Sequence, residues 1–262
     1  MFFGCLFIVL ALVGTALTYG LLPALSLWWA LPLAVGLYVA LGALYIVLVL
    51  TIALLLPDTP PSPRRYEVYH WVIVHTLSWI MLLLGFRVTL TGGERLPTDR
   101  PFLLVSNHRS GFDPLVTLAV LKRWSVGFVA KPEIFRIPVI RVAMKKACFL
   151  AIDRENARNA VATIKQAAEQ ITTLGLSMAI YPEGTRNKES EALLPFHAGS
   201  FKIAKLAACP VAVMTIRYEK RRHLPGKRVS IQVVDLMDET FVAENNTATL
   251  SERAKAKMEE HQ

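Results

Sequence analysis

The first 57 residues of this chain contain no charged side chain. From Met1 to Pro57 the sequence has no Asp, Glu, Lys or Arg. As one continuous helix this run would be about 85 Å long, whereas the hydrocarbon core of a bilayer is about 30 Å thick. The run is therefore too long for a single transmembrane helix and too apolar to face water.

Helix-breaking residues divide this apolar run into two parts. Gly20, Pro23 and Pro32 bracket a turn that also holds a pair of tryptophans, a residue type enriched at membrane–water interfaces. We predict a transmembrane hairpin with one helix over residues 2–20 and a second over residues 33–56. The alternative is a cleaved signal peptide, but basic residues are missing from the N-terminus and the apolar character continues far beyond any cleavage point.

The whole formal net charge of +9 lies after residue 57. Arg64 and Arg65 follow the second predicted helix, and basic residues flank the cytoplasmic side of membrane segments. We therefore expect a multi-pass protein of the cell membrane whose basic domain lies on the cytoplasmic face of the lipid bilayer. Nucleic acid is the other partner that a basic protein suggests, but no nucleic-acid-binding motif is present, and we expect no nucleic acid to bind.

The three cysteines indicate neither metal binding nor redox chemistry. Cys5, Cys148 and Cys209 form no CxxC pair, and with the six histidines they give no metal-ligand spacing. We expect no metal site. Cys148 and Cys209 are expected to be small buried hydrophobic residues in a reducing compartment.

Composition divides the chain into four segments. They are the hairpin at residues 1–57, a proline-rich linker and apolar helix at 58–85, the main domain at 86–240 and a polar C-terminal tail at 241–262. The apolar part, Tyr66–Gly85, is short for a membrane span and contains polar residues. We expect a helix that lies along the membrane interface or packs on the core, with a third span as the alternative.

Apolar segments alternate with helical patterns through the main domain. Strands are predicted at residues 86–90, 102–106, 126–130, 149–152, 177–181, 211–218 and 228–234. Helices are predicted at 114–123, at 133–145 with a break at Pro138, at 156–174 ending at Gly175, and at 199–208. This alternation predicts an α/β fold with a mixed, largely parallel sheet covered by helices.

Polar residues follow the strand at 102–106, and functional residues gather at the carboxyl ends of strands in such sheets. His108 and Asp113 stand five positions apart across a loop that contains a glycine. A carboxylate on one ring nitrogen of a histidine fixes the tautomer and leaves the other nitrogen free to accept a proton. Asp113 followed by Pro114 is also typical of a helix N-cap, a role compatible with the first.

A second polar segment, YPEGTRN at residues 181–187, follows the strand at 177–181. Glycine lets backbone amides approach a ligand, and threonine and arginine supply donors suited to phosphate. A plain turn is the alternative. Arg154 leaves the end of the strand at 149–152, where it either meets the same phosphate or is solvated at the surface.

Together these segments resemble the glycerophospholipid acyltransferases, most closely the 1-acylglycerol-3-phosphate acyltransferases. The resemblance is carried by His108-x4-Asp113, PEGTR at 182–186, FLAIDR at 149–154, PFHAGSFK at 195–202 and PVAV at 210–213, and it covers residues 86–219. The sequence departs from the family at Tyr181, where phenylalanine is usual, and at Met214-Thr215, where proline and valine are more typical. These departures concern acyl-chain preference more than the chemistry.

The resemblance implies a glycerolipid acyltransferase fold in a catalytic domain at residues 86–240. It implies transfer of a fatty acyl group from acyl-CoA or acyl carrier protein, both substrates rather than cofactors, to the sn-2 hydroxyl of lysophosphatidic acid, which gives phosphatidic acid. His108 would be the general base and Asp113 its orienting partner. The residues implied to bind the acceptor near its phosphate are Glu183, Gly184, Thr185, Arg186, Arg154 and, with less support, Lys131.

The physical chemistry of the reaction agrees with this assignment. A lipid hydroxyl does not ionise at neutral pH, so its proton has to leave as the oxygen attacks the thioester. Imidazole, with an ordinary pKa near 6.5, suits that role. Because the sequence has no GxSxG or cysteine–histidine motif, direct transfer is favoured over an acyl-enzyme. The oxyanion donor stays open between a backbone amide and Lys131, and residues 66–85 with the second predicted span are hypothesised to line an acyl-chain groove.

Other functions remain as alternatives. The acceptor could be glycerol-3-phosphate, another lysophospholipid or an amine-bearing lipid, since the motifs are shared across the wider family. A branch of the family that acylates lipid A precursors carries glutamate where this chain has Asp113, which argues against that acceptor. A non-catalytic binder of lipid phosphate has no need of a His–Asp pair, and nucleotide-binding or phosphatase motifs are missing from the sequence.

Overall fold

The computed structural model describes residues 2–22, 27–55, 63–136, 138–153, 156–187, 192–220 and 227–261 of the chain. Contacts between residues divide the chain into two compact units, Met1–Thr59 and Pro60–Gln262. Most of the predicted proline-rich linker lies outside the described residues. The two units are described separately.

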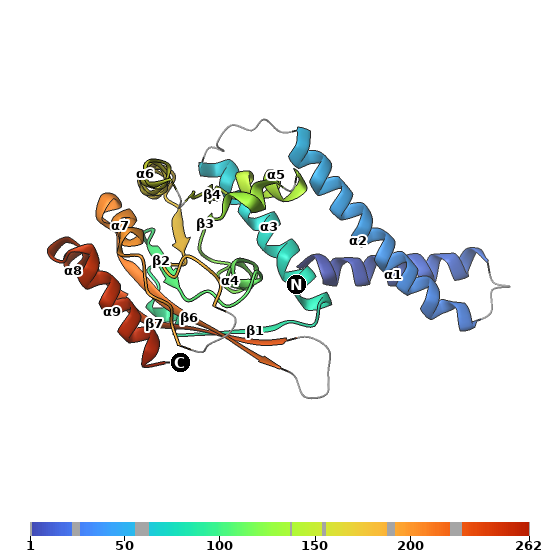
Figure 1. Ribbon diagram of the computed structural model, residues 1–262. Helices are drawn as coiled ribbons and strands as arrows, with labels where there is room; N and C mark the ends of the chain where they lie inside the picture. Colours follow the sequence, from blue (N-terminus) through green and yellow to red (C-terminus); the bar gives the residue numbers. More distant parts are fainter. Residues whose placement is uncertain are drawn as a thin grey trace. The chain divides into compact units, whose positions relative to one another are not determined.

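The first unit is an antiparallel pair of apolar helices (Figure 1). They are α1 (Phe2–Leu21) and α2 (Ala30–Leu55), and a short 3₁₀ turn, η1 (Leu27–Trp29), lies before α2. The sequence has no charged residue in these helices or between them. Near the start of α1 the Phe3 ring lies 4.4 Å from the ring of Tyr45, and one turn later Phe7 lies 6.4 Å from Tyr38. These contacts confirm the two helices that the sequence predicted.

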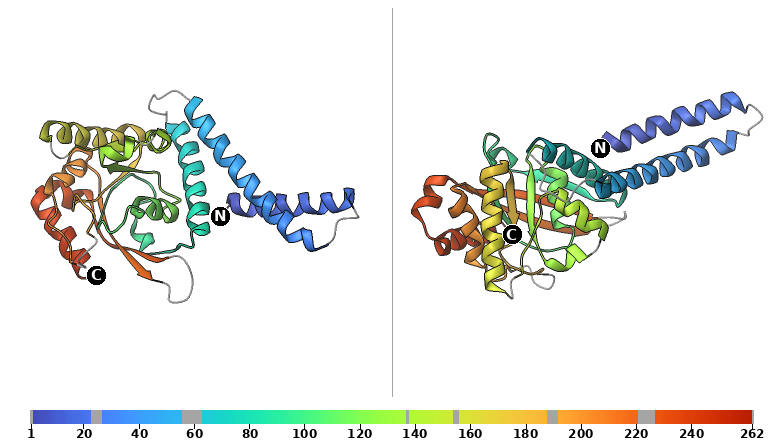
Figure 2. Two further views of the ribbon diagram at one scale, coloured as in Figure 1. Left: turned by 45° about the vertical axis from the view of Figure 1, so that its right-hand side comes forward. Right: turned by 90° about the horizontal axis from the view of Figure 1, so that it is seen from above.

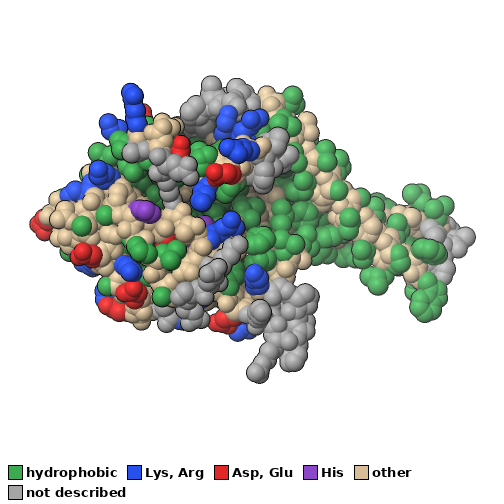
Figure 3. All heavy atoms as spheres, in the orientation of Figure 1, with side chains coloured by type: hydrophobic (Ala, Val, Ile, Leu, Met, Phe, Trp, Pro, Cys, Tyr) green, Lys and Arg blue, Asp and Glu red, His purple; other side chains and the backbone are tan. Residues whose placement is uncertain are grey.

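Both helices are long and apolar enough to cross a membrane. Hydrophobic side chains cover the visible face of α1 and α2, whereas Lys, Arg, Asp and Glu side chains lie on the second unit (Figure 3). Only 6% of the apolar stretch Leu27–Ile52 is buried inside the protein. A core helix of a soluble protein would be mostly buried, so the outward-facing apolar surface of α2 indicates contact with lipid.

The second unit is built on a mixed sheet (Figures 1 and 2). Its described residues form seven strands in the order β1-β7-β6-β2-β5-β3-β4. They are β1 (Arg87–Thr91), β2 (Leu103–Ser106), β3 (Val126–Ala130), β4 (Leu150–Ala151), β5 (Ser177–Ile180), β6 (Val211–Lys220) and β7 (Lys227–Met237). β6 and β7 pair antiparallel and the other neighbours pair parallel. The predicted α/β fold with a largely parallel sheet is confirmed.

Helices cover both faces of this sheet. They are α3 (Pro63–Leu83), α4 (Asp113–Val120), α5 (Pro138–Lys146), α6 (Ala157–Leu174), α7 (Lys202–Ala207), α8 (Glu239–Glu244) and α9 (Thr247–Glu259), with short 3₁₀ turns η2 (Gly93–Arg95), η3 (Pro132–Arg136) and η4 (Ala198–Phe201). One apolar core joins the sheet to α6, α7, α8 and α9. The other joins it to α3 and α4.

β2 shows how one short strand serves both cores. Leu103 and Val105 belong to the core under α6 and α7, whereas Phe102 and Leu104 belong to the core under α3 and α4. Successive side chains of a strand point to opposite faces. A strand covered on both faces therefore needs a continuous apolar run, as residues 102–105 provide.

α3 packs on the core of the second unit. Val74 and Met81 are buried beside residues of α4 and the sheet. Val68 and Trp71, on the same helix, are exposed. The apolar part of this helix is shorter than a membrane span. Of the two expected arrangements, packing on the core is therefore observed, and contact with a membrane interface stays a prediction.

The prediction that residues 241–262 form a polar tail is wrong, because helices that pack on the core occupy this segment. α8 and α9 occupy most of this segment, and the side chains of Asp238 and Asn246 cap their N-termini. Val242, Leu250 and Met258 are buried in the core shared with α6 and α7. The apolar stripe is only one residue wide per turn, so it is hidden among polar residues in the sequence.

Replacing Val242 by alanine is expected to lower the free energy of unfolding by about 1.5–2.5 kcal/mol, because two buried carbons are lost and a cavity remains. Val242 is 1% exposed. The matched control is Val161→Ala on α6, where the valine is 47% exposed and the change should stay within about 0.5 kcal/mol. Denaturant unfolding measures both, and equal effects would show that residues 239–259 do not belong to the folded core.

Candidate active site

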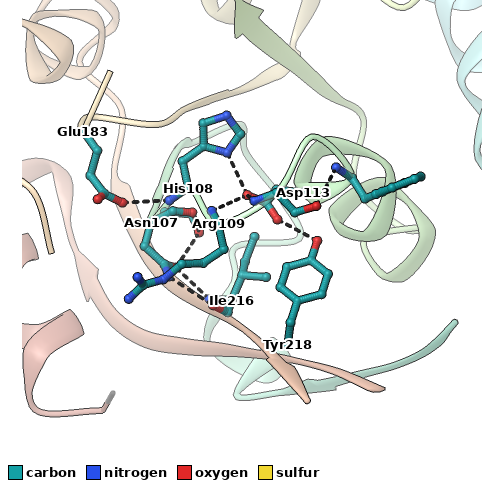
Figure 4. A network of polar contacts seen from close by, with 10 residues as sticks. Asn107, His108, Arg109, Asp113, Glu183, Ile216 and Tyr218 are labelled. Carbon is teal, nitrogen blue, oxygen red and sulfur yellow. Dashed lines mark hydrogen bonds and ion pairs between the residues drawn. The ribbon is translucent and has the colours of Figure 1, made fainter. Parts of the chain in front are cut away.

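The candidate site lies at the carboxyl ends of neighbouring parallel strands. β2 pairs with β5, with Val105 opposite Ile180. The loop from Asn107 to Phe112 leaves β2, and the loop from Tyr181 to Asn187 leaves β5. Because parallel neighbours end at the same edge of the sheet, the two polar segments predicted from the sequence lie side by side (Figure 4).

His108 and Asp113 form the pair that the sequence predicted. The Nδ1 atom of His108 lies 2.7 Å from Oδ2 of Asp113. The Asp113 side chain is fully buried, whereas 19% of the His108 side chain is exposed. A carboxylate on Nδ1 leaves Nε2 as the ring nitrogen that can accept a proton at the surface of the site.

Asp113 does not cap the helix that it begins. α4 starts at Asp113 with Phe112 at the N-cap position and no capping side chain. The carboxylate turns back instead, and Oδ2 accepts hydrogen bonds from the backbone N–H groups of Arg109 at 2.7 Å and Ser110 at 2.8 Å. Oδ1 accepts a hydrogen bond of 2.6 Å from the hydroxyl of Tyr218 on β6. The predicted N-cap role of Asp113 is wrong, because both of its carboxylate oxygens bind groups in the loop and on β6 instead of the N–H groups of α4.

The imidazole of His108 lies flat against Tyr181. The two ring centroids are 4.2 Å apart and the ring planes differ by 9°. Burial, followed by the nearby Asp113 carboxylate, raises the pKa of the Tyr181 phenol well above its ordinary value, so the ring is neutral. Tyr181 thus supplies a rigid aromatic surface that holds the imidazole, a role that the sequence did not indicate.

Glu183 connects the two loops. It is buried, its Oε1 accepts a hydrogen bond of 2.7 Å from the backbone N–H of His108, and its Oε2 accepts one of 3.1 Å from the N–H of Leu194. The carbonyl of His108 in turn accepts a hydrogen bond of 2.8 Å from the N–H of Asn187. Both backbone groups of His108 are therefore held by the second loop. Phosphate binding by Glu183 stays a prediction, and the geometry adds a positioning role.

Gly184, Thr185 and Arg186 complete the exposed side of the second loop. Gly184 has φ +77°, a conformation that glycine adopts without strain, and Thr185 and Arg186 are exposed. The Arg186 guanidinium lies over the first loop, since a β-carbon added at Gly111 would be 3.4 Å from its Nη1 atom. A cation therefore lies beside the loop that joins His108 to Asp113.

Two further predicted residues are less closely defined. Lys131 follows β3 at the same edge of the sheet and is exposed. Arg154 lies outside the described residues, so its predicted phosphate contact stays a prediction.

Asn107 anchors the first loop and was missed by the sequence analysis. Its Nδ2 donates a hydrogen bond of 3.0 Å to the carbonyl of Ile216, and its Oδ1 accepts one of 2.7 Å from the N–H of Ile216. The side chain is buried. A buried amide satisfies both its donor and its acceptor in this way. The available signal was a second polar residue at the end of a strand that begins with three apolar residues.

Nothing in the described part of the chain points to a second chemistry. No group of three or more His, Cys, Asp or Glu side chains among the described residues could hold a metal ion. Cys148 and Cys209 are buried, as predicted, and burial raises the pKa of each thiol to about 12. Neither forms a thiolate at neutral pH, so neither is suited to act as a nucleophile.

The comparison with protein families agrees with this site. The family model described as Acyltransferase matches residues 87–217, from the first residue of β1 to Arg217 within β6. The chain belongs to the Acyltransferase family. Both polar loops of the candidate site lie inside the part that matches this family.

Curated acyltransferases of known name are similar to this chain. The 1-acyl-sn-glycerol-3-phosphate acyltransferase alpha of Ovis aries is 28% identical over 188 residues, which are 70% of this chain and 65% of the relative. The enzyme of the same name from Homo sapiens is 27% identical over 188 residues, 70% of this chain and 66% of the relative. The chloroplastic 1-acyl-sn-glycerol-3-phosphate acyltransferase BAT2 of Brassica napus is 34% identical over 154 residues, 58% and 44%. The chain thus spans at most 66% of the length of these relatives.

A solved structure shows the same acyltransferase fold. The crystal structure of the 1-acyl-sn-glycerophosphate (LPA) acyltransferase PlsC from Thermotoga maritima matches with a TM-score of 0.56. The match covers 76% of this chain and 79% of that chain at 24% identity. The fold class expected from the resemblance is therefore confirmed.

Proposed function

We propose that this protein transfers a fatty acyl group from an acyl thioester to the sn-2 hydroxyl of lysophosphatidic acid, giving phosphatidic acid. The observation that carries this proposal is the His108–Asp113 pair, with Nε2 of His108 free and the Arg186 cation beside it. A general base next to a cationic group is what attack by a phosphate-bearing alcohol requires. The family membership and the names of the similar proteins support the same reaction.

In the proposed mechanism His108 moves one proton twice. As the acceptor oxygen bonds to the thioester carbonyl carbon, its proton passes to Nε2 of His108. The tetrahedral intermediate then expels the thiolate, which takes the proton from the imidazolium, so that an ester and a free thiol result. The buried Asp113 carboxylate stabilises the imidazolium while it exists.

The second loop is proposed to bind the acceptor phosphate. Arg186 supplies a planar pair of donors and exposed Thr185 adds a hydroxyl, while Gly184, whose own N–H donates to the carbonyl of Tyr181, is proposed to let the phosphate approach the loop closely. Lys131 and Arg154 are proposed to join them. Glu183 contributes mainly by holding His108, because a buried carboxylate that faces backbone N–H groups would repel a phosphate.

The apolar hairpin has a use in this reaction, because the acceptor's tail lies in the bilayer. We propose that α1 and α2 cross the membrane and that the second unit lies on its cytoplasmic face. The acyl donor, acyl-CoA or acyl carrier protein, would then reach the site from the cytoplasm. That α3 and α2 line an acyl-chain groove stays a hypothesis. An unchanged acyl-chain profile after exchange of residues 1–85 for those of a relative with another preference would count against it.

The test is acyl transfer by the full chain in liposomes or detergent, with radiolabelled acyl-CoA or acyl carrier protein as donor. Lysophosphatidic acid, glycerol-3-phosphate and a neutral-headgroup lysophospholipid are compared as acceptors. We expect phosphatidic acid from lysophosphatidic acid at a kcat/KM at least about tenfold above the other acceptors. A neutral headgroup lacks the charge-assisted phosphate contact, and glycerol-3-phosphate lacks the apolar tail. Higher activity toward another acceptor would replace the proposed substrate. No transfer from either donor to any acceptor would refute the proposed function.

A further inference from the structure

Tyr218 binds the oxygen of Asp113 that does not face His108. Its hydroxyl donates a hydrogen bond of 2.6 Å to Oδ1, whereas His108 and the loop N–H groups of Arg109 and Ser110 bind Oδ2. The two carboxylate oxygens therefore have separate partners (Figure 4). Rotation of the carboxylate away from His108 would break bonds on both sides.

Asp113 is a fully buried carboxylate that faces the His108 ring, two backbone N–H groups and the Tyr218 hydroxyl. Burial disfavours an ionised carboxylate, and hydrogen bonds to the charged form favour it. Tyr218 is a dependable donor, because its own pKa is raised above the ordinary value by burial and by the Asp113 charge. Its hydroxyl therefore stays protonated throughout the pH range in which histidine titrates.

Strand β6 brings both ends of the first loop to one place. Ile216 pairs with the side chain of Asn107 at the start of the loop, and Tyr218, two residues further on, binds Asp113 at its end. The backbone of Ile216 and the side chain of Tyr218 therefore hold the two ends of the loop from one short stretch of β6. β7 supports this stretch, since Tyr218 pairs with Val229, and Lys227 Nζ lies 5.5 Å from the Tyr218 ring centroid.

We infer that Tyr218 is a positioning residue for acyl transfer, which holds the Asp113 carboxylate ionised and directed at Nδ1 of His108. The inference rests on the proposed function. Tyr218 does not touch the reacting atoms. It acts through Asp113 on the proton affinity and orientation of the imidazole.

The test is Tyr218→Phe in the full chain, assayed with lysophosphatidic acid and an acyl thioester. This change removes one hydroxyl and keeps the ring. We expect kcat to fall about 10- to 150-fold, the range of a hydrogen bond to a charged group, while KM for both substrates stays within about twofold. The acid limb of the kcat/KM profile should move to higher pH. Without the Tyr218 donor the ionised carboxylate is a stronger hydrogen-bond acceptor for Nδ1 of His108, so it holds the imidazolium more tightly.

The matched control is Tyr19→Phe on α1, which removes the same atom from the first unit and should leave kcat and the pH profile unchanged. Thermal unfolding of each variant checks the fold. If Tyr218→Phe does not fold, fluorotyrosine at position 218 replaces it. This residue keeps the hydroxyl, makes it a stronger donor and should move the acid limb to lower pH.

The outcomes separate the two claims. An active wild-type protein whose Tyr218→Phe variant keeps the kcat and pH profile of wild type would overturn the inference and leave the proposed function intact. A fall in kcat without any shift of the acid limb would also overturn it, because a purely structural defect produces that result. A wild-type protein with no transferase activity would overturn the proposed function, and the inference with it.

Discussion

Replacing His108 by alanine is expected to lower kcat for acyl transfer by about 10²–10⁴-fold, the usual contribution of a general base. The imidazole is the group that combines a buried carboxylate on Nδ1 with an exposed Nε2 in the described site. Without it the acceptor hydroxyl has to lose its proton to water. The KM for lysophosphatidic acid should change little, because the second loop, and not His108, is proposed to bind the phosphate. Initial rates of phosphatidic acid formation at saturating substrates measure the effect.

The control for this variant is His261→Ala near the end of α9, which removes a histidine outside the site and should keep wild-type kcat. Binding of wild type and His108→Ala to lipid is a second measurement, made by flotation with liposomes that contain lysophosphatidic acid. Retained binding with lost turnover is the expected result for His108→Ala. Equal kcat in wild type and variant would refute the role of His108 as base, and lost binding would favour a lipid-phosphate binder.

Replacing Glu183 by alanine is expected to damage both stability and turnover. The variant leaves the half-buried N–H groups of His108 and Leu194 without their acceptor, each at a cost of about 1–3 kcal/mol. The free energy of unfolding should fall by about 2–5 kcal/mol. Because a shift of about 1 Å in a reacting group can cost about 10²-fold in rate, kcat should fall at least about tenfold. Denaturant unfolding and steady-state kinetics measure the two effects.

Glu183→Gln tests whether the hydrogen bonds of Glu183 or its negative charge matter more. Its amide offers one acceptor oxygen, so one of the two N–H groups would face an NH₂ donor, and we expect a loss between those of wild type and Glu183→Ala. Glu169→Ala, on the exposed side of α6, is the control for loss of a glutamate. A Glu183→Ala variant with wild-type stability and kcat but a raised KM for lysophosphatidic acid would show that Glu183 binds substrate, as the family resemblance implied.

Much of the fold could be predicted because its signals are local. Helix α6 is an example: the side chain of Asn156 accepts hydrogen bonds from Arg158 and Asn159, and Gly175 ends the helix with φ +66°. Both ends were readable from residue types alone. The core strand β2 was readable for the same reason, since four adjacent residues had to be apolar to face two cores.

The C-terminal helices show where local signals fail. The apolar residues that α9 buries are Leu250, Ala254 and Met258, one at every fourth position, and all but one of the residues between them are polar. An apolar stripe this narrow makes the helix only weakly amphipathic, so its sequence resembles that of a solvated tail. The core that receives these side chains comes from α6, α7 and the sheet, and it exists only after they have packed.

The sequence by itself determined the apolar hairpin, the order of the strands and of the helices up to α7, and the presence of a His–Asp pair and an arginine-bearing loop. These follow from charge, from periodicity and from motifs in which the partners are five to seven residues apart. Only the tertiary structure decided how the pair is held. Tyr218 lies 105 positions from Asp113, Ile216 lies 109 from Asn107, and Glu183 lies 75 from His108. Contacts across such separations leave no local pattern, because the sheet brings the partners together only when it forms.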